Sequence, residues 1–247
     1  MTTTLPGKEL AAALEAESRG LAETSPLDPV IEAAASGGLT ADQHYKLIGQ
    51  LWAMERMYYY IYGAWGSSLV VNQYPPSVDY LFSKQIYDDS THEMLYSQAI
   101  IQRGWSKGQR LALQHPYCQF PYDSGIAVFV GSMRALGIYA QNVRLPALNL
   151  GAKVLEVAWL ERMAEAMPDQ YLRDLFASQL PETRSHVQMG RFMVERYVSQ
   201  QVDVEMCRLM TATARNDYNS AMTYIAEFVM GNRTPAILTQ LEMPDVD

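Results

Sequence analysis

Two short stretches, YDDSTH at residues 87–92 and PETRSH at residues 181–186, carry the same arrangement of side chains. In each stretch a carboxylate precedes a histidine by three or four residues. Residues with that spacing share one face of an α-helix, so each stretch can offer a carboxylate and an imidazole to the same cation. The pair predicts two helices that each supply part of one metal site.

Each stretch also has an acidic residue upstream of it in an apolar helical segment. Glu55 lies in LWAMERM at residues 51–57, and Glu156 lies in KVLEVAW at residues 153–159. Both fall on the apolar stripe of their helix and not on the polar side, where a surface glutamate is expected. The sequence therefore predicts six inward ligands, which are Glu55, Asp89, His92, Glu156, Glu182 and His186.

The ligands of the two sets lie at matching distances, along their helices, from the turns that join the helices. The helices predicted at 40–66 and 77–104 form one antiparallel hairpin, and those at 149–167 and 170–200 form another. The expected helix starts are a capping box of Thr40 with Gln43 and caps at Ser77, Asn149 and Asp169, and Pro146 is expected to lie beyond the end of the preceding helix. Counted from the turn of each hairpin, the carboxylates lie about 12 residues away on both helices. Antiparallel packing then brings each set to one level.

The remaining segments complete an all-α fold, because no stretch has the period of a β-strand. A third long helix is predicted at 125–144 and carries no carboxylate, and a last helix is predicted at 203–230. The expected organisation is an N-terminal arm with short helices at 1–39, a helical domain at 40–231 and a C-terminal tail at 232–247.

Composition narrows the class of protein. The chain has 247 residues, 49% of them hydrophobic, which is enough for one large domain. A net charge of −8 argues against a nucleic-acid partner. Cys118 and Cys207 are isolated, which predicts neither a disulfide scaffold nor a thiolate zinc site. The N-terminus has no secretory pattern, and Arg134 interrupts the longest apolar run, so we expect a cytoplasmic protein with no membrane partner.

Four buried carboxylates require positive charge nearby, because an unpaired buried carboxylate costs several kcal/mol. Two divalent cations would supply it. Oxygen-rich ligands with one imidazole per cation and no thiolate favour iron or manganese over structural zinc. A salt-bridged polar core with no metal stays open as an alternative, and its cations would be Arg56, Lys153 and Arg184.

These residues resemble the ferritin-like di-iron carboxylate proteins, which include ribonucleotide reductase small subunits, soluble hydrocarbon monooxygenase hydroxylases and the phenylacetyl-CoA epoxidase group. That family takes a Glu from each of two helices and a Glu-x-x-His motif from each of two others. The resemblance covers about residues 41–200 and implies a ferritin-like four-helix bundle with additional flanking helices. It implies Glu55 and Glu156 as the single ligands, Asp89 with His92 as the first paired motif, and His186 as the second histidine.

The resemblance also implies an activity. It suggests two iron ions, or one manganese and one iron, that react with O2 and oxidise a small-molecule substrate using electrons from a separate reductase. It further implies a homo- or hetero-oligomer. The 16 Tyr and 14 Met suit a largely apolar or aromatic substrate. We therefore predict an O2-dependent di-iron oxygenase or oxidase, while iron storage fits poorly with the insertion at 104–148.

This sequence departs from the family pattern in both paired motifs. Asp89 is shorter than the usual Glu, and Asp88 could serve in its place. Thr183 stands where the family has Glu, so Glu182 can ligate only if a π-type bulge next to Pro181 re-phases the helix. An alignment without gaps from His186 would also place Lys153 at the second single-ligand position. The alternative function is therefore a metal-poor ferritin-like accessory subunit that scaffolds a catalytic partner.

Overall fold

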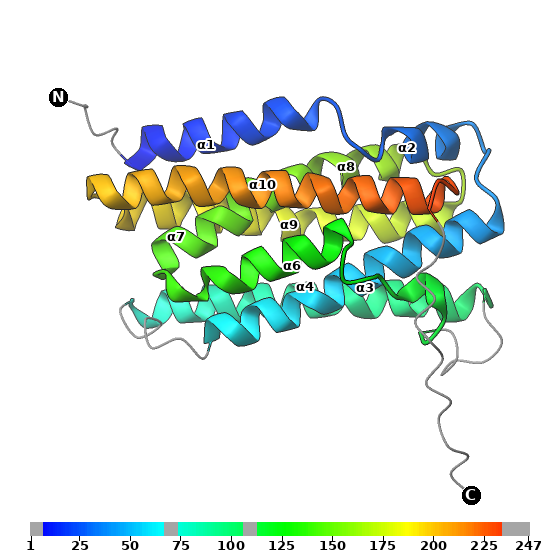
Figure 1. The fold of residues 1–247 in the computed structure, drawn as a ribbon, viewed down its shortest axis with the longest axis horizontal. Coiled ribbons are helices and arrows are strands. Elements are labelled where there is room, and N and C mark those ends of the chain that lie inside the picture. The colour runs from blue at the N-terminus through cyan, green and yellow to red at the C-terminus, as the bar shows by residue number, and fades with distance from the viewer. Residues whose placement is uncertain (1–6, 67–73, 106–112, 234–247) are drawn as a thin grey trace, which may run out of the picture.

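The computed structural model describes residues 7–66, 74–105 and 113–233, and every regular element within them is helical (Figure 1). The all-α prediction is thus confirmed for these residues. The α-helices are α1 (Gly7–Ala22), α2 (Asp28–Ala35), α3 (Ala41–Gly66), α4 (Pro76–Gln102), α6 (Gly125–Ala135), α7 (Gln141–Pro146), α8 (Lys153–Ala166), α9 (Gln170–Tyr197) and α10 (Gln201–Val229). Short 3-10 turns η2 (Pro116–Cys118) and η3 (Leu136–Ile138) and a π-helix η4 (Ala147–Ala152) complete the set.

Two helical hairpins form the centre of the molecule. Helices α3 and α4 make one hairpin, helices α8 and α9 make the other, and α4 packs against α9. Figure 1 shows α3 and α4 along the lower side of the molecule, with α8, α9 and α10 above them. The predicted antiparallel pairs are therefore present.

Local sequence signals explain where these helices begin. Thr40 and Gln43 form the predicted capping box at the start of α3, since each side chain accepts a hydrogen bond from the other residue's backbone N–H at 3.2 and 3.0 Å. Asp169 caps α9 by accepting from the N–H of Leu172 at 3.0 Å. Helix α4 begins at Pro76, one residue before the expected cap Ser77, because proline has the right φ angle for a first helical turn.

The segment from 125 to 152 differs from the prediction of one helix at 125–144. It forms α6, η3, α7 and the π-helix η4 in succession, and Pro146 lies inside the helical run instead of beyond it. Proline has no N–H to bond the carbonyl of Asn142, and the thiol of Cys207 donates to that carbonyl at 3.1 Å. Asn149, which we expected to cap a helix, is buried within η4 and bonds the Gln85 side chain.

The π-helix η4 packs closely between α9 and α10. A Cβ on Gly190 of α9 would lie 2.7 Å from that of Asn149, and a Cβ on Gly151 would lie 2.8 Å from the Thr211 carbonyl of α10. Both contacts are closer than real Cβ atoms allow, so glycine is required at both positions. The π-helix is therefore in close contact with both α9 and α10.

The N-terminal region, for which an arm with short helices was expected, contributes to a hydrophobic core. Leu10 and Leu14 of α1 are fully buried in a cluster with Val154, Val187 and Val194. Helix α1 therefore packs on α8 and α9 and covers the second hairpin.

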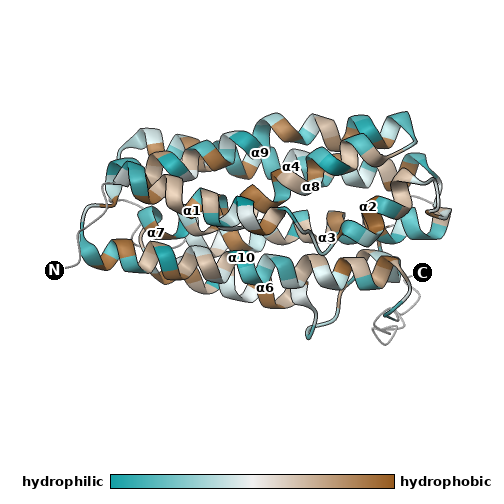
Figure 2. Ribbon diagram, turned by 90° about the horizontal axis from the view of Figure 1, so that it is seen from above, coloured by the Kyte–Doolittle hydropathy of each residue, from teal (hydrophilic) through white to brown (hydrophobic). Residues whose placement is uncertain are grey.

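Figure 2 shows hydrophilic and hydrophobic residues interspersed along the helices. Among the described helices, none combines the length and the apolar character needed to span a bilayer.

Candidate metal centre

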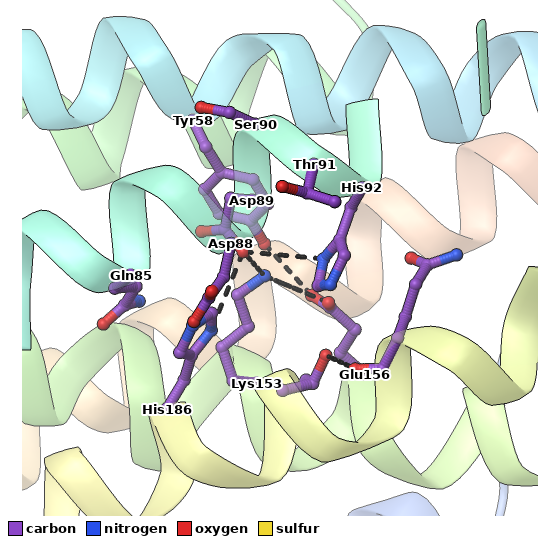
Figure 3. A network of polar contacts seen from close by, with 12 residues as sticks. Tyr58, Gln85, Asp88, Asp89, Ser90, Thr91, His92, Lys153, Glu156 and His186 are labelled. Carbon is purple, nitrogen blue, oxygen red and sulfur yellow. Dashed lines mark hydrogen bonds and ion pairs between the residues drawn. The ribbon is translucent and has the colours of Figure 1, made fainter. Parts of the chain in front are cut away.

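The polar residues of the core converge from four helices at one level of the bundle (Figure 3). Helix α3 supplies Glu55, α8 supplies Glu156, and both are at most 5% exposed. The other buried polar residues of α4, α8 and α9 are Gln85, Asp88, Asp89 and His92 from α4, Lys153 from α8, and Gln179, Thr183 and His186 from α9. Five of the six predicted ligands are thus buried, and Glu182 is the exception.

Glu55, Asp89 and His92 form a compact group of possible ligands. One carboxylate oxygen from each acid and one imidazole nitrogen lie within 4.8 Å of one another. Oε2 of Glu55 and both ring nitrogens of His92 are buried and have no hydrogen-bond partner. Buried polar atoms are almost always satisfied, so the unpaired oxygen of Glu55 and the unpaired nitrogens of His92 indicate missing partners. One metal ion could bind an oxygen of Glu55 and one of the two His92 nitrogens, because the two nitrogens of an imidazole ring point in different directions.

The ammonium group of Lys153 lies beside this group. Its Nζ is 3.1 Å from Oδ1 of Asp89 and 3.0 Å from the carboxylate of Glu156, and the side chain is fully buried. It also lies 4.1 Å from the centre of the Tyr58 ring, within range of a cation–π interaction. Lys153 therefore joins two residues that we expected to ligate metal ions.

Charge interactions keep the Lys153–Asp89 pair ionised. Burial alone would lower the pKa of Lys153, but the carboxylates of Asp89, Glu156 and Glu55 raise it well above its usual value. Burial would likewise raise the pKa of Asp89, but the Lys153 ammonium, the two neighbouring histidines and the Tyr62 hydroxyl together outweigh it, and the pKa is lowered. An ammonium and a carboxylate therefore face each other in the core.

Burial disfavours the charged forms of the other groups in the cluster. Burial raises the pKa of Glu55 well above its usual value, and Lys153 offsets this only in part. Burial also raises the pKa of Glu156. For His92, burial lowers the pKa to about 4, against the attraction of Asp89. His92 is therefore a neutral imidazole near pH 7, which is the form that binds metals.

Phenol groups complete the hydrogen bonds of the buried acids. Tyr62 donates to Oδ2 of Asp89, and Tyr58 donates to Oε2 of Glu156 at 3.2 Å. Tyr218 lies 3.5 Å from the same oxygen and accepts a bond from the Trp159 indole at 2.8 Å. Burial raises the pKa of all three tyrosines well above the usual value, so they remain donors.

His186 has a different partner from the one predicted. Its Nε2 lies 3.1 Å from Oδ2 of Asp88, which also accepts from Lys84 at 2.5 Å. Burial would raise the pKa of Asp88, but the bonds to His186 and Lys84 lower it. Asp88, considered above only as a substitute for Asp89, is therefore the carboxylate that the structure brings to His186.

Glu182 lies away from the cluster because α9 stays regular through Pro181. No π-bulge occurs there, so Thr183 faces inward with no exposed surface, and its hydroxyl donates to the Gln179 carbonyl at 2.9 Å. Glu182 is partly exposed, and within the described ranges no hydrogen bond or ion pair joins it to His186. The π-helix of this protein occurs at η4 instead.

The donor set fits one cation better than two. Glu55, Asp89 and Glu156 carry three negative charges when ionised, and Lys153 supplies one positive charge, so one divalent ion completes the balance. A second divalent ion beside the Lys153 ammonium would meet like charge and would have Thr183 in place of a carboxylate. What the described residues show is a buried Glu/Asp/His group that could hold a metal ion.

The sequence analysis did not predict the hydrogen bonds of Gln85 and Asn149. Gln85 donates to the Tyr62 hydroxyl at 3.1 Å and exchanges hydrogen bonds with Asn149, which ties α4 to the π-helix. Gln85 stands on the inward stripe of α4, four residues before Asp89, so its position was a usable signal. The role of Asn149 was not readable, because it depends on the π-helix.

Comparison with known proteins gives no assignment, since no protein-family model, no curated protein and no solved structure matches this chain.

Proposed function

We propose that this chain is a ferritin-like oxidoreductase that binds one iron or manganese ion at Glu55, Asp89 and His92 and oxidises a small, largely apolar or aromatic molecule with O2. The observation that carries the proposal is the group of three buried ligand atoms within 4.8 Å, two of them on residues with unsatisfied polar atoms. This reading keeps the first half of the expected di-iron centre. It replaces the second metal ion with the Lys153 ammonium.

The ligand types support a redox-active metal. Imidazole is a ligand that suits iron, and carboxylates suit manganese, so a set of two carboxylates and one neutral imidazole is compatible with either ion. Such an ion would supply electron transfer to O2, and the electrons would come from a separate reductase. Thiolates that would favour structural zinc are absent from this group.

The surrounding residues would orient the ligands and exclude water. Lys153 donates a hydrogen bond to Oδ1 of Asp89 and Tyr62 donates one to Oδ2, which limits rotation of that carboxylate. Tyr58 and Lys153 fix Glu156 in the same way. Such supporting contacts set the geometry and basicity of metal ligands.

A second candidate function is a metal-poor accessory subunit that scaffolds a catalytic partner. The ion pairs of Lys153 with Asp89 and Glu156 favour it, because they satisfy two of the expected metal ligands without any metal. Thr183 in place of a carboxylate favours it as well. The two candidates differ in whether Glu55 and His92 bind an ion.

Metal stoichiometry separates these readings. The protein is loaded with Fe(II) without oxygen, or with Mn(II), freed of excess metal by gel filtration, and assayed for metal per chain. We expect about one ion per chain, none in the His92→Ala variant, and O2 consumption by the Fe(II) form. A value near zero supports the accessory subunit, and a value near two restores the di-iron expectation.

A further inference from the structure

The outer face of α4 carries a regular line of exposed apolar side chains. Tyr80, Tyr87 and Met94 are 69%, 71% and 50% exposed, and they repeat every seven residues. Residues seven apart lie on the same side of a helix, so the three side chains form a line about 21 Å long. Exposed tyrosines in such a row are unusual on a surface that contacts only water.

Helix α3 widens this surface. Tyr59 and Tyr60 are 44% and 53% exposed, and they follow Arg56 by three and four residues. Arg56 forms an ion pair with Glu93 of α4 at 3.4 Å, which places this side of α3 next to α4. The five side chains Tyr59, Tyr60, Tyr80, Tyr87 and Met94 are called the tyrosine face below.

The tyrosine face is almost uncharged on α4. Among the exposed residues between 80 and 98, Lys84 is the single charged one, and Asp88 neutralises it at 2.5 Å. The chain as a whole has a net charge of −8. Two copies of the protein would therefore repel each other over most surfaces but could meet here without burying an uncompensated charge.

We propose that the tyrosine face binds a second copy of this chain across a two-fold axis. Three equally spaced side chains on one helix are self-complementary when two such helices run antiparallel. Tyr87 then meets Tyr87 of the other copy on the axis, and Tyr80 of each copy meets Met94 of the other. Such an isologous contact is the commonest form of oligomer.

The tyrosine face supplies the apolar centre of a dimer interface, and polar residues around it would supply the rest of the area. Aromatic side chains bury about 150–250 Å² each, so the four partly exposed tyrosines together with Met94 offer roughly 500 Å² per copy. A stable interface buries about 800 Å² per partner, with a polar rim around its apolar centre. Within the described part of the chain, α4 makes its main contacts with α3 and α9, and its outer face is left uncovered.

Other partners fit this face less well. An anionic lipid surface or a nucleic acid would require clustered Lys and Arg side chains. The tyrosine face offers Lys84 and Arg56, and both already form ion pairs with carboxylates. A second copy is the occupant that this surface matches.

Cysteine crosslinking tests the axis directly, since Cys118 and Cys207 are buried and remain in the background. Tyr87→Cys should form a disulfide-linked dimer on mild oxidation, because a residue on the axis meets itself. Tyr80→Cys alone should not crosslink, but it should do so when mixed with Met94→Cys. Leu209→Cys on α10, which is 57% exposed, is the matched control and should stay monomeric in the gel.

Sedimentation velocity on the full-length protein provides the second measurement. The unmodified chain should sediment as a dimer, Tyr87→Glu should shift it to a monomer with unchanged circular dichroism, and Leu209→Glu should leave the dimer intact. A monomer at every concentration, or a dimer that tolerates Tyr87→Glu, would overturn the proposal. Binding of a monomer to phosphatidylserine vesicles through Tyr87 would instead assign the face to a membrane surface.

Discussion

Lys153 is the residue whose role depends most on its exact surroundings. Its ammonium is fully buried and pairs with two carboxylates, whereas Lys84 is 43% exposed and pairs with one. Removing one partner of a fully buried ion pair costs about 3–5 kcal/mol, while a pair such as Lys84–Asp88, in which the lysine is exposed to solvent, contributes less, toward the roughly 0–1 kcal/mol of exposed pairs. We expect Lys153→Met to lower the free energy of unfolding of the metal-free protein by the larger amount and Lys84→Met by the smaller, as measured by urea denaturation. Equal losses would show that Lys153 is not paired in the folded core.

His92 and His186 make a second comparison between individual residues. Both ring nitrogens of His92 lack a partner, while Nε2 of His186 is bonded to Asp88. His92→Ala should therefore weaken metal binding by at least ~100-fold, and His186→Ala should change it by less than ~10-fold. Isothermal titration with Mn(II) measures both. The opposite ranking would move the metal site to the α8–α9 hairpin.

At this scale the sequence predicts which residues point inward but not which atoms they meet. The 3.6-residue period places Glu55, Asp89, His92 and His186 in the core, because inward position depends only on helix phase. The pairing of His186 with Asp88 depends on ångström-level distances between two helices. Neither spacing nor periodicity carries that information.

Helix α9 determines whether the second half of the centre can hold a metal. Because the helix is regular across Pro181, Thr183 faces the cluster and Glu182 does not. We expect Glu182→Ala to leave the metal content per chain unchanged. A loss of metal in this variant would show that α9 can re-phase in solution.

A variant that adds carboxylates to the second half of the centre also tests whether Lys153 and Thr183 prevent a second metal ion from binding. Lys153→Glu combined with Thr183→Glu removes the ammonium and adds two carboxylates on the inward faces of α8 and α9. The double variant should raise the metal content from about one ion per chain to about two. Lys153→Glu with Arg184→Glu, whose second change falls on the exposed side of α9, is the matched control and should remain near one. Equal content in the two variants would refute this account of the second site.

Element boundaries were predictable where a local signal exists. The capping box at Thr40 and the cap at Asp169 fix two helix starts through contacts over three residues. The π-helix at 147–152 has no such signal, since it depends on Gly151 and Gly190 packing against other helices. Pro146 and Asn149 therefore suggested that one helix ends and another begins at a place where the helical run is in fact continuous.

For the whole molecule, the buried His92 predicts a dependence of stability on pH. Its pKa is about 4 when folded and 6.5 in the unfolded reference, so the unfolded chain binds more protons between these values. The stability of the metal-free protein should fall as pH decreases through this window, by about 3 kcal/mol from this residue alone. Urea denaturation of the parent and of His92→Gln at a series of pH values isolates the contribution of His92 to the free energy of unfolding. Parallel curves for the two proteins would exclude it.

The all-helical architecture was predictable because it rests on many residues, each of which contributes a little to the periodic pattern. The contribution of α1 to the core was not, since its short apolar stripe gives no information on whether a partner surface exists. That surface is built by α8 and α9, more than 130 residues later in the chain.

The Lys153 ammonium finally bears on the order of events when the protein is made. A centre balanced only by metal ions would leave a new chain with mutually repelling acids until the ions arrived. Here the counter-ion is part of the polypeptide and is present as soon as α8 is synthesised. We expect the chain to close its core first and to receive its ion afterwards, so that a cell short of metal would accumulate folded protein ready for loading instead of losing it to proteolysis.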